Sequence, residues 1–243
     1  MNIILPLAGI SKFNNQDNFY PPLLREVAGR PLIQHVIENL LTIKGENKFI
    51  YVVNEEDCLK FHLDKTLGLL TPNCNVVILK NETSGAVCSI LMAMDYVNKY
   101  ESTIIVNADQ IFSVDLNNIL DYFRHNNSDA GLISFDSVHP RWSYLQCDEK
   151  NIVVQTAEKQ PISRLAIAGF YFFKSFTDFT KSAFAAIEME DFLDGKLYTS
   201  TLINQMILMN KKVTNITVEK DDYISFYSNQ RVTEFERYLT SKT

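Results

Sequence analysis

The sequence begins with Met1-Asn-Ile-Ile-Leu-Pro-Leu-Ala-Gly9, and this stretch decides the fold that we expect for the rest of the chain. A short apolar run that ends on small residues is typical of a buried strand entering a turn. Small residues at such a turn let the backbone approach a ligand closely, and free amides can then donate to phosphate oxygens. A plain strand-to-loop turn has the same composition, so the stretch alone leaves both interpretations open.

Strand and helix signals alternate through the first half of the chain. Apolar residues at helical spacing predict helices, and short apolar runs predict strands. The predicted helices span residues 31–41, 85–97 and 116–123, and the predicted strands span residues 3–7, 49–53, 76–79 and 103–106. This order is typical of a parallel sheet covered by helices.

The second half has a different pattern, because several strand signals follow one another with little helix between them. The predicted strands span residues 130–135, 143–146, 152–156, 167–173 and 213–218, and the predicted helices span residues 177–187, 199–209 and 233–239. Consecutive strands of this kind indicate an antiparallel extension of the same sheet. We therefore expect one α/β domain, residues 1–243, with a mixed, mainly parallel sheet and helices on both faces.

The composition excludes some classes of partner. The net charge of -6 argues against nucleic-acid binding, which needs a basic face, but it allows a small phosphate ligand. The four cysteines lack metal-site spacing and predict reduced thiols in a cytoplasmic protein. They are Cys58, Cys74, Cys88 and Cys147. The opening apolar run is too short for a signal peptide, and no apolar run has the length of a membrane span.

Ligands of open parallel α/β sheets bind beyond the carboxyl ends of the strands, where three segments should meet. The first is the opening turn, in which Ser11 and Lys12 add a hydroxyl and a positive charge. The second is Glu82-Thr-Ser-Gly-Ala86, where Thr83 or Ser84 can cap a helix and Gly85 lets a flat ligand lie on the backbone. An ordinary capped helix explains this second segment equally well.

The third segment is Asn107-Ala-Asp109-Gln110, directly after the predicted strand 103–106. A carboxylate at the carboxyl end of a central strand is well placed to hold a divalent cation, which would neutralise phosphate oxygens. Asp109 could instead cap a nearby turn. We favour the metal interpretation, because a buried strand rarely ends on a charge without a partner.

Motifs in the right order along almost the whole chain carry a family resemblance. After the opening strand come Tyr20-Pro21, Glu26-Val27-Ala-Gly-Arg-Pro-Leu32, Thr83-Ser-Gly-Ala-Val87, Val106-Asn-Ala-Asp109, Trp142-Ser-Tyr144, Asp148-Glu-Lys-Asn151, Ala157-Glu158-Lys159 and Ala168-Gly169-Phe-Tyr171. Together they resemble the sugar-phosphate nucleotidyltransferases, in particular the branch that serves capsules and cell surfaces. The resemblance implies a Rossmann-like fold that is shared with A-type glycosyltransferases.

The resemblance also implies a reaction. A sugar 1-phosphate, or a similar small phosphate monoester, would attack the α-phosphorus of a nucleoside triphosphate with Mg2+ as cofactor, which gives an NDP-sugar and pyrophosphate for polysaccharide synthesis. Residues 1–128 would form the nucleotide-binding half and residues 129–243 the acceptor half. The implied sites are Leu7, Ala8, Gly9, Ser11, Ser84, Gly85 and Asn107 for the nucleotide, Lys12, Arg25 and Asp109 for catalysis, Glu158, Lys159 and Gly169 for the acceptor, and Asp109 with Asp222 for the metal. Association of the chain with itself is left open.

The sequence departs from the family pattern at three places. Lys12 stands where an arginine is usual, and Tyr20-Pro21-Pro22 lacks the usual lysine, so that Arg25 is the nearest cation downstream. Ser225 lies near the position of a second metal carboxylate, for which Asp221 or Asp222 could substitute. These departures keep two alternatives open. One is an A-type glycosyltransferase that uses an NDP-sugar, which Asn107 disfavours because it occupies the first acidic position of a D-x-D-like pair. The other is a non-catalytic relative that binds a nucleotide.

Overall fold

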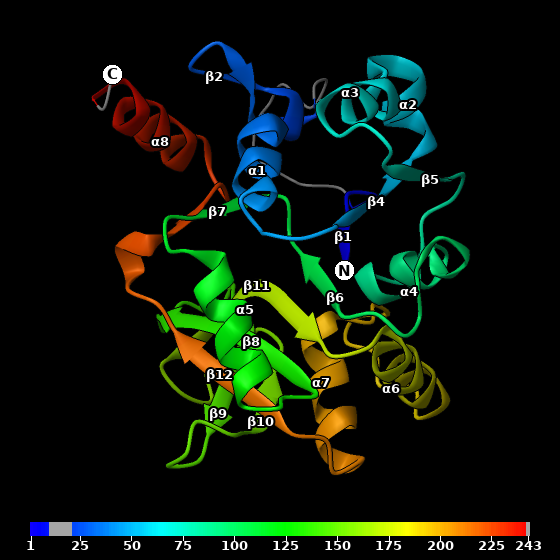
Figure 1. Ribbon diagram of the computed structural model, residues 1–243, viewed down its shortest axis with the longest axis vertical. Helices are drawn as coiled ribbons and strands as arrows, with labels where there is room; N and C mark the ends of the chain where they lie inside the picture. The colour runs from blue at the N-terminus through cyan, green and yellow to red at the C-terminus, as the bar shows by residue number, and fades with distance from the viewer. Residues whose placement is uncertain (10–20, 242–243) are drawn as a thin grey trace.

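The computed structural model describes residues 1–9 and 21–241, and a twisted nine-stranded sheet runs through it (Figure 1). The first half of the chain supplies the parallel part, in the order β6, β1, β4, β5. These strands are β1 (Asn2–Pro6), β4 (Lys48–Asn54), β5 (Asn75–Leu79) and β6 (Thr103–Val106). Their apolar composition suits strands that are covered on both faces.

The second half extends this sheet beyond β6. The long strand β11 (Leu165–Phe173) pairs antiparallel with β8 on one side, and on the other side with β9 near its start and with β6 near its end. The remaining strands of the extension are β8 (Ala130–Asp136), β9 (Tyr144–Cys147), β10 (Val153–Ala157) and β12 (Val213–Thr217). Only β12 departs from the antiparallel arrangement, because it pairs parallel with β8. The predicted α/β class with a mixed sheet is confirmed.

Helices cover both faces of the sheet and enclose two hydrophobic cores. Side chains alternate along β1, so Ile3 and Leu5 lie in one core and Ile4 in the other. The first core receives α1 (Leu32–Leu41), α2 (Glu55–Phe61), α3 (Leu63–Leu70), α5 (Leu116–His125) and α8 (Asn229–Ser241). The second receives α4 (Ala86–Leu91), α6 (Phe176–Glu188) and α7 (Thr199–Leu208). Among the described residues, no helix is long and apolar enough to cross a membrane.

The predicted helix 85–97 is wrong in its length. Helix α4 ends at Leu91 and a 3-10 turn, Met94–Tyr96, follows it. The hydrogen bonds tighten at this point, since the amide of Ala93 donates to the carbonyl of Ile90. Short elements that the sequence pattern did not predict complete the fold. They are β2 (Glu26–Val27), β3 (Arg30–Pro31), β7 (Gln110–Phe112), β13 (Tyr223–Ser225) and the 3-10 turns Pro22–Leu24 and Lys220–Asp222.

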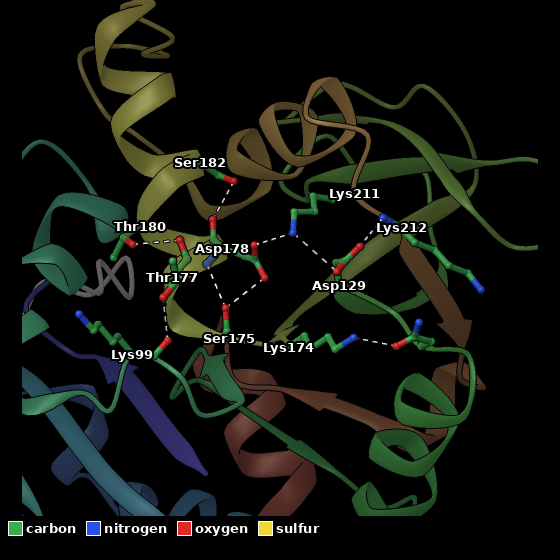
Figure 2. A network of polar contacts seen from close by, with 11 residues as sticks. Lys99, Asp129, Lys174, Ser175, Thr177, Asp178, Thr180, Ser182, Lys211 and Lys212 are labelled. Carbon is green, nitrogen blue, oxygen red and sulfur yellow. Dashed lines mark hydrogen bonds and ion pairs between the residues drawn. The ribbon is translucent and has the colours of Figure 1, made fainter.

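An ionic network joins α6 to the start of β8 (Figure 2). Lys211 lies 2.8 Å from the carboxylate of Asp178, in the first turn of α6, and 3.8 Å from that of Asp129. Ser175 caps the same helix, and its hydroxyl accepts from the amide of Asp178. Strand β8 runs in the same direction as β6, because both are antiparallel to β11. The network therefore lies at the edge of the sheet opposite to the carboxyl end of β6.

Candidate active site

The segment after β6 lies at the carboxyl edge of the sheet and is fixed by two other segments. The amide of Asn107 donates to the carbonyl of Gly169 at 2.9 Å, and the amide of Phe226 donates to the carbonyl of Asp109 at 2.7 Å. The buried side chain of Gln110 donates to the carbonyl of Gly169 and accepts from the hydroxyl of Tyr223, each at 3.0 Å. The structure thus brings Asn107, Asp109 and Gly169 together.

Gly169 is the residue that lets β11 pass so close to this loop. Its φ is +61°, and a Cβ atom there would lie 2.5 Å from Nδ2 of Asn107 and 2.9 Å from Oε1 of Gln110. The pairing of β11 with β8 shifts register between Ile167 and Tyr171, which is the signature of a bulge. A side chain at position 169 would therefore displace Asn107 from the end of β6.

Asp109 carries a carboxyl group in an environment that disfavours its charge. Burial raises the pKa of this carboxyl, and a backbone hydrogen bond offsets the rise in part. No lysine, arginine or histidine forms an ion pair with it among the described residues. A cation bound at this carboxylate would remove the unfavourable contribution of burial.

Two buried tyrosines connect Asp109 to the acceptor side. Burial, followed by the charge of Asp109 and by Tyr171, raises the pKa of Tyr223 well above its ordinary value. Burial and the charge of Glu158 raise the pKa of Tyr171 in the same way. Electrostatic interactions therefore join Asp109 to Tyr223, Tyr223 to Tyr171, and Tyr171 to Glu158. Neither tyrosine was predicted from the sequence as a site residue, although Tyr171 is the one residue of the strand-core run 170–173 that carries a hydroxyl.

Glu158 and Lys159, the predicted acceptor residues, follow β10 directly. The hydroxyls of Ser143 and Ser200 both donate to Oε2 of Glu158, the latter at 2.7 Å. Lys159 has a φ of +55°. Its ammonium group donates to the hydroxyl of Tyr198 at 3.0 Å, and this bond is the main cause that raises its pKa. The pair thus offers a carboxylate and an ammonium group side by side.

The described part of the first loop leaves a buried strand, as predicted. Leu7 is buried, and its amide donates to the carbonyl of Val52 at 2.7 Å. Ala8 is half-buried and Gly9 is exposed, so the backbone reaches the surface directly after β1. Ser11 and Lys12 lie outside the described residues.

The predicted base-contacting segment is packed on the chain that leads to Tyr198. Gly85 has a φ of +102°, and a Cβ atom there would lie 2.5 Å from the carbonyl oxygen of Leu197. The amide of Leu197 donates to the carbonyl of Ser84 at 2.7 Å. This contact brings the second nucleotide segment next to the acceptor residues, because Tyr198 is the hydrogen-bond partner of Lys159.

Arg25 and Asp222 lie elsewhere. Nη1 of Arg25 donates to Oδ1 of Asn229 at 2.6 Å, at the start of α8, and no described contact joins Arg25 to Asp109. Asp222 accepts from the hydroxyl of Ser113 at 2.8 Å. The antiparallel pairing of β13 with β7 sets Ser225 opposite Gln110. Asp222 therefore lies about four residues, roughly 13 Å, along the pair from the loop of Asp109. The structure does not bring the two predicted metal carboxylates together.

A family model described as "Nucleotidyl transferase" matches residues 17–217. The chain belongs to the nucleotidyl transferase family. The predicted membership of a nucleotidyltransferase family, which is a family of enzymes, is confirmed.

Among curated proteins the chain is similar to the bifunctional protein GlmU of two organisms. It is 27% identical over 177 residues to that of Methanocaldococcus jannaschii, which is 69% of this chain and 37% of the relative. It is 22% identical over 144 residues to that of Gloeothece citriformis, which is 58% of this chain and 31% of the relative. The chain thus spans about a third of the length of the curated relatives that it matches.

Solved structures of nucleotidyl transferase type share the fold over the whole chain. A nucleoside-diphosphate-sugar pyrophosphorylase from Vibrio cholerae superposes with a TM-score of 0.82 at 23% identity, covering 98% of this chain and all of that one. A UDP-glucose pyrophosphorylase complexed with UDP-glucose gives 0.76 at 14% identity, covering 100% and 99%. At these identities the likeness concerns the fold.

Proposed function

We propose that this member of the nucleotidyl transferase family transfers a nucleoside monophosphate from a nucleoside triphosphate to a sugar 1-phosphate or a similar small phosphate monoester. The observation that carries the proposal is the hydrogen bond between Asn107 and Gly169, because it joins the end of β6 to the acceptor strand β11. The charge of Asp109 acts on the buried Tyr223, and the charge of Glu158 acts on the buried Tyr171, two residues after Gly169. A triphosphate bound at Asp109 and an acceptor bound at Glu158 would then be adjacent.

In this reaction an oxygen of the acceptor phosphate attacks the α-phosphorus. The bond from the α-phosphorus to the oxygen that bridges to the β-phosphate breaks, and pyrophosphate leaves with that electron pair. Positioning and charge neutralisation account for most of the catalysis in such transfers. Lys159 would hold the acceptor phosphate, and Glu158 would accept from a hydroxyl of the acceptor. Arg25 and Lys12 remain the candidate cations for the triphosphate.

Magnesium is part of the proposal, and the residues present fit it only together with a nucleotide. The described residues contain no group of three or more His, Cys, Asp or Glu side chains that could hold a metal ion. Mg2+ needs no such group, because it commonly binds one or two carboxylates together with substrate phosphates and water. Asp109 would be its protein ligand, and the ion would neutralise charge on the phosphate oxygens. Asp222, which bonds to Ser113 and lies about four residues along the strand pair from the loop of Asp109, would not be a ligand of the same ion.

The remaining parts of the proposal concern the setting of the reaction. Residues 1–128 would bind the nucleotide and residues 129–243 the acceptor, within one domain. The product would be a precursor of capsular or other cell-surface polysaccharide, which the motifs Trp142-Ser-Tyr144 and Asp148-Glu-Lys-Asn151 support. The four cysteines are free, which supports a cytoplasmic location.

A substrate screen tests the proposal. Each common nucleoside triphosphate is incubated with Mg2+ and with glucose 1-phosphate, N-acetylglucosamine 1-phosphate or a non-sugar phosphate monoester, and released pyrophosphate is measured. We expect release with at least one pair and none without the acceptor. If the folded protein releases no pyrophosphate with any pair, the proposal fails. Sugar transfer from an NDP-sugar without use of a triphosphate would indicate a glycosyltransferase, and nucleotide binding that ignores magnesium would indicate a binding module.

A further inference from the structure

The carboxylate of Glu158 is held through one of its two oxygens. Ser143 lies in the loop before β9, and Ser200 lies in the first turn of α7. Both hydroxyls donate to Oε2 of Glu158. Oε1 accepts no hydrogen bond from any described residue. A carboxylate held in this way has a fixed orientation and one oxygen left for a ligand.

The two serines are themselves fixed by the fold. Ser200 is 1% exposed, and its carbonyl accepts from the hydroxyl of Thr156, the residue two positions before Glu158, at 2.7 Å. Asn204, one turn further along α7, bonds both the amide and the carbonyl of Thr156. Helix α7 and strand β10 are therefore joined at the place where Glu158 leaves the strand.

Ser143 is linked to the buried tyrosine of β11. Burial and the charge of Glu158 raise the pKa of the Tyr171 phenol, and Ser143 lowers it. The two serine hydroxyls and the carboxylate of Glu158 form one hydrogen-bonded cluster, and the phenol of Tyr171 lies within its electrostatic range. The cluster joins the loop before β9 to helix α7, and Glu158 is its charged member. Because hydroxyl donors stabilise a carboxylate without cancelling its charge, Glu158 remains available to a second donor.

We propose that Ser143 and Ser200 are positioning residues, which hold Glu158 through Oε2 so that Oε1 accepts from a hydroxyl or ammonium group of the acceptor. The inference rests on the proposed function and deepens it. It defines the acceptor as a phosphate monoester that carries a hydrogen-bond donor, since a bare alkyl phosphate would leave Oε1 buried against it without a partner. Lys159, the next residue, would bind the phosphate of the same molecule.

A double-mutant cycle on Ser200 and Glu158 tests the proposal. We expect Ser200→Ala to raise the KM of the acceptor about tenfold, because it removes a hydrogen bond to a charged group, and to change the KM of the triphosphate less than about twofold. In the background of Glu158→Ala, the same substitution should have no further effect on the KM of the acceptor. Ser143→Ala should behave like Ser200→Ala.

Ser182→Ala is the matched control, because Ser182 is also a buried helix serine, and its hydroxyl donates to the carbonyl of Asp178 and not to Glu158. It should leave both KM values unchanged. Equal rises of the two KM values in Ser200→Ala, or the same rise with and without Glu158, would overturn the positioning role. If the wild type releases no pyrophosphate, the proposed function fails separately, and UDP-glucose affinities are then compared by calorimetry. A roughly tenfold weaker affinity in Ser200→Ala supports the positioning role, and equal affinities, or no binding by either protein, overturn it.

Discussion

The backbone amide of Phe226 donates to the backbone carbonyl of Asp109 over 2.7 Å. The bond continues the antiparallel pairing of β13 with β7, so the segment after β13 fixes the backbone of the loop that carries Asp109. The carboxylate takes no part in this pairing. Burial disfavours its charge, and no described cation pairs with it. A buried carboxylate whose charge is unfavourable and has no described cation beside it is well suited to bind a ligand.

Asp109→Asn should therefore separate activity from stability. We expect kcat to fall about 100-fold or more, because the loss of one charge-neutralising group costs roughly 3 kcal/mol in the transition state. The melting temperature should stay the same or rise, since the amide has the shape of the carboxylate without its charge. Pyrophosphate release and thermal unfolding measure the two effects. Asp136→Asn, which breaks only an exposed ion pair with Arg164, is the control and should keep full activity.

The same substitution gives a test of the pH dependence of stability. Burial raises the pKa of Asp109 above its ordinary value of 3.8, so the folded protein holds this proton to higher pH than the unfolded chain does. The stability that the protonated group contributes is fully present below the unfolded pKa and is lost as the pH rises through the folded pKa. The free energy of unfolding of Asp109→Asn minus that of the wild type should increase across this window and then remain constant.

Denaturant unfolding at intervals from about pH 4 to about pH 8 measures this difference. Carboxyls whose pKa is lowered, such as those of Glu101 and Asp136, shift stability in the opposite sense, but they are common to both proteins and cancel in the difference. A difference that does not change with pH would show that burial does not perturb the carboxyl of Asp109.

The sequence predicts the part of the site in which neighbours along the chain are also neighbours in space. The apolar strand that ends at Val106 runs directly into Asp109, so its place at the sheet edge follows from local pattern alone. The partners of Glu158 do not follow, because Ser143 and Ser200 lie 15 and 42 residues away and meet it only through tertiary packing. Register is equally non-local, which is why the position of Asp222 could not be predicted from spacing.

Lys211→Met should lower stability without affecting catalysis. Lys211 lies between Asp178 and Asp129, and its removal leaves the carboxylate of Asp178, which is only 13% exposed, without a cation. We expect a loss of about 1 kcal/mol in the free energy of unfolding, and less in high salt, because the lysine itself is partly in solvent. Lys60→Met, which breaks an exposed helix pair with Glu56, is the control and should change stability by less than about 0.5 kcal/mol. Equal losses for the two variants would mean that the network in Figure 2 adds nothing to an ordinary surface pair.

Gly85→Ala tests the contact between the nucleotide segment and the acceptor segment. A Cβ atom at position 85 would lie 2.5 Å from the carbonyl oxygen and 2.7 Å from the amide nitrogen of Leu197, at a φ of +102° that disfavours any side chain. We expect a loss of about 2 to 4 kcal/mol in the free energy of unfolding and a higher KM for both substrates, since the segment of Leu197 continues to Tyr198, the hydrogen-bond partner of Lys159. Gly68→Ala is the matched control, because Gly68 lies in helix α3 with no atom within 4 Å of the added Cβ. It should raise stability by about 0.5 to 1 kcal/mol and leave both KM values unchanged. Denaturant unfolding and steady-state kinetics of the two variants check this, and a Gly85→Ala protein with wild-type stability would show that the two segments are not in contact.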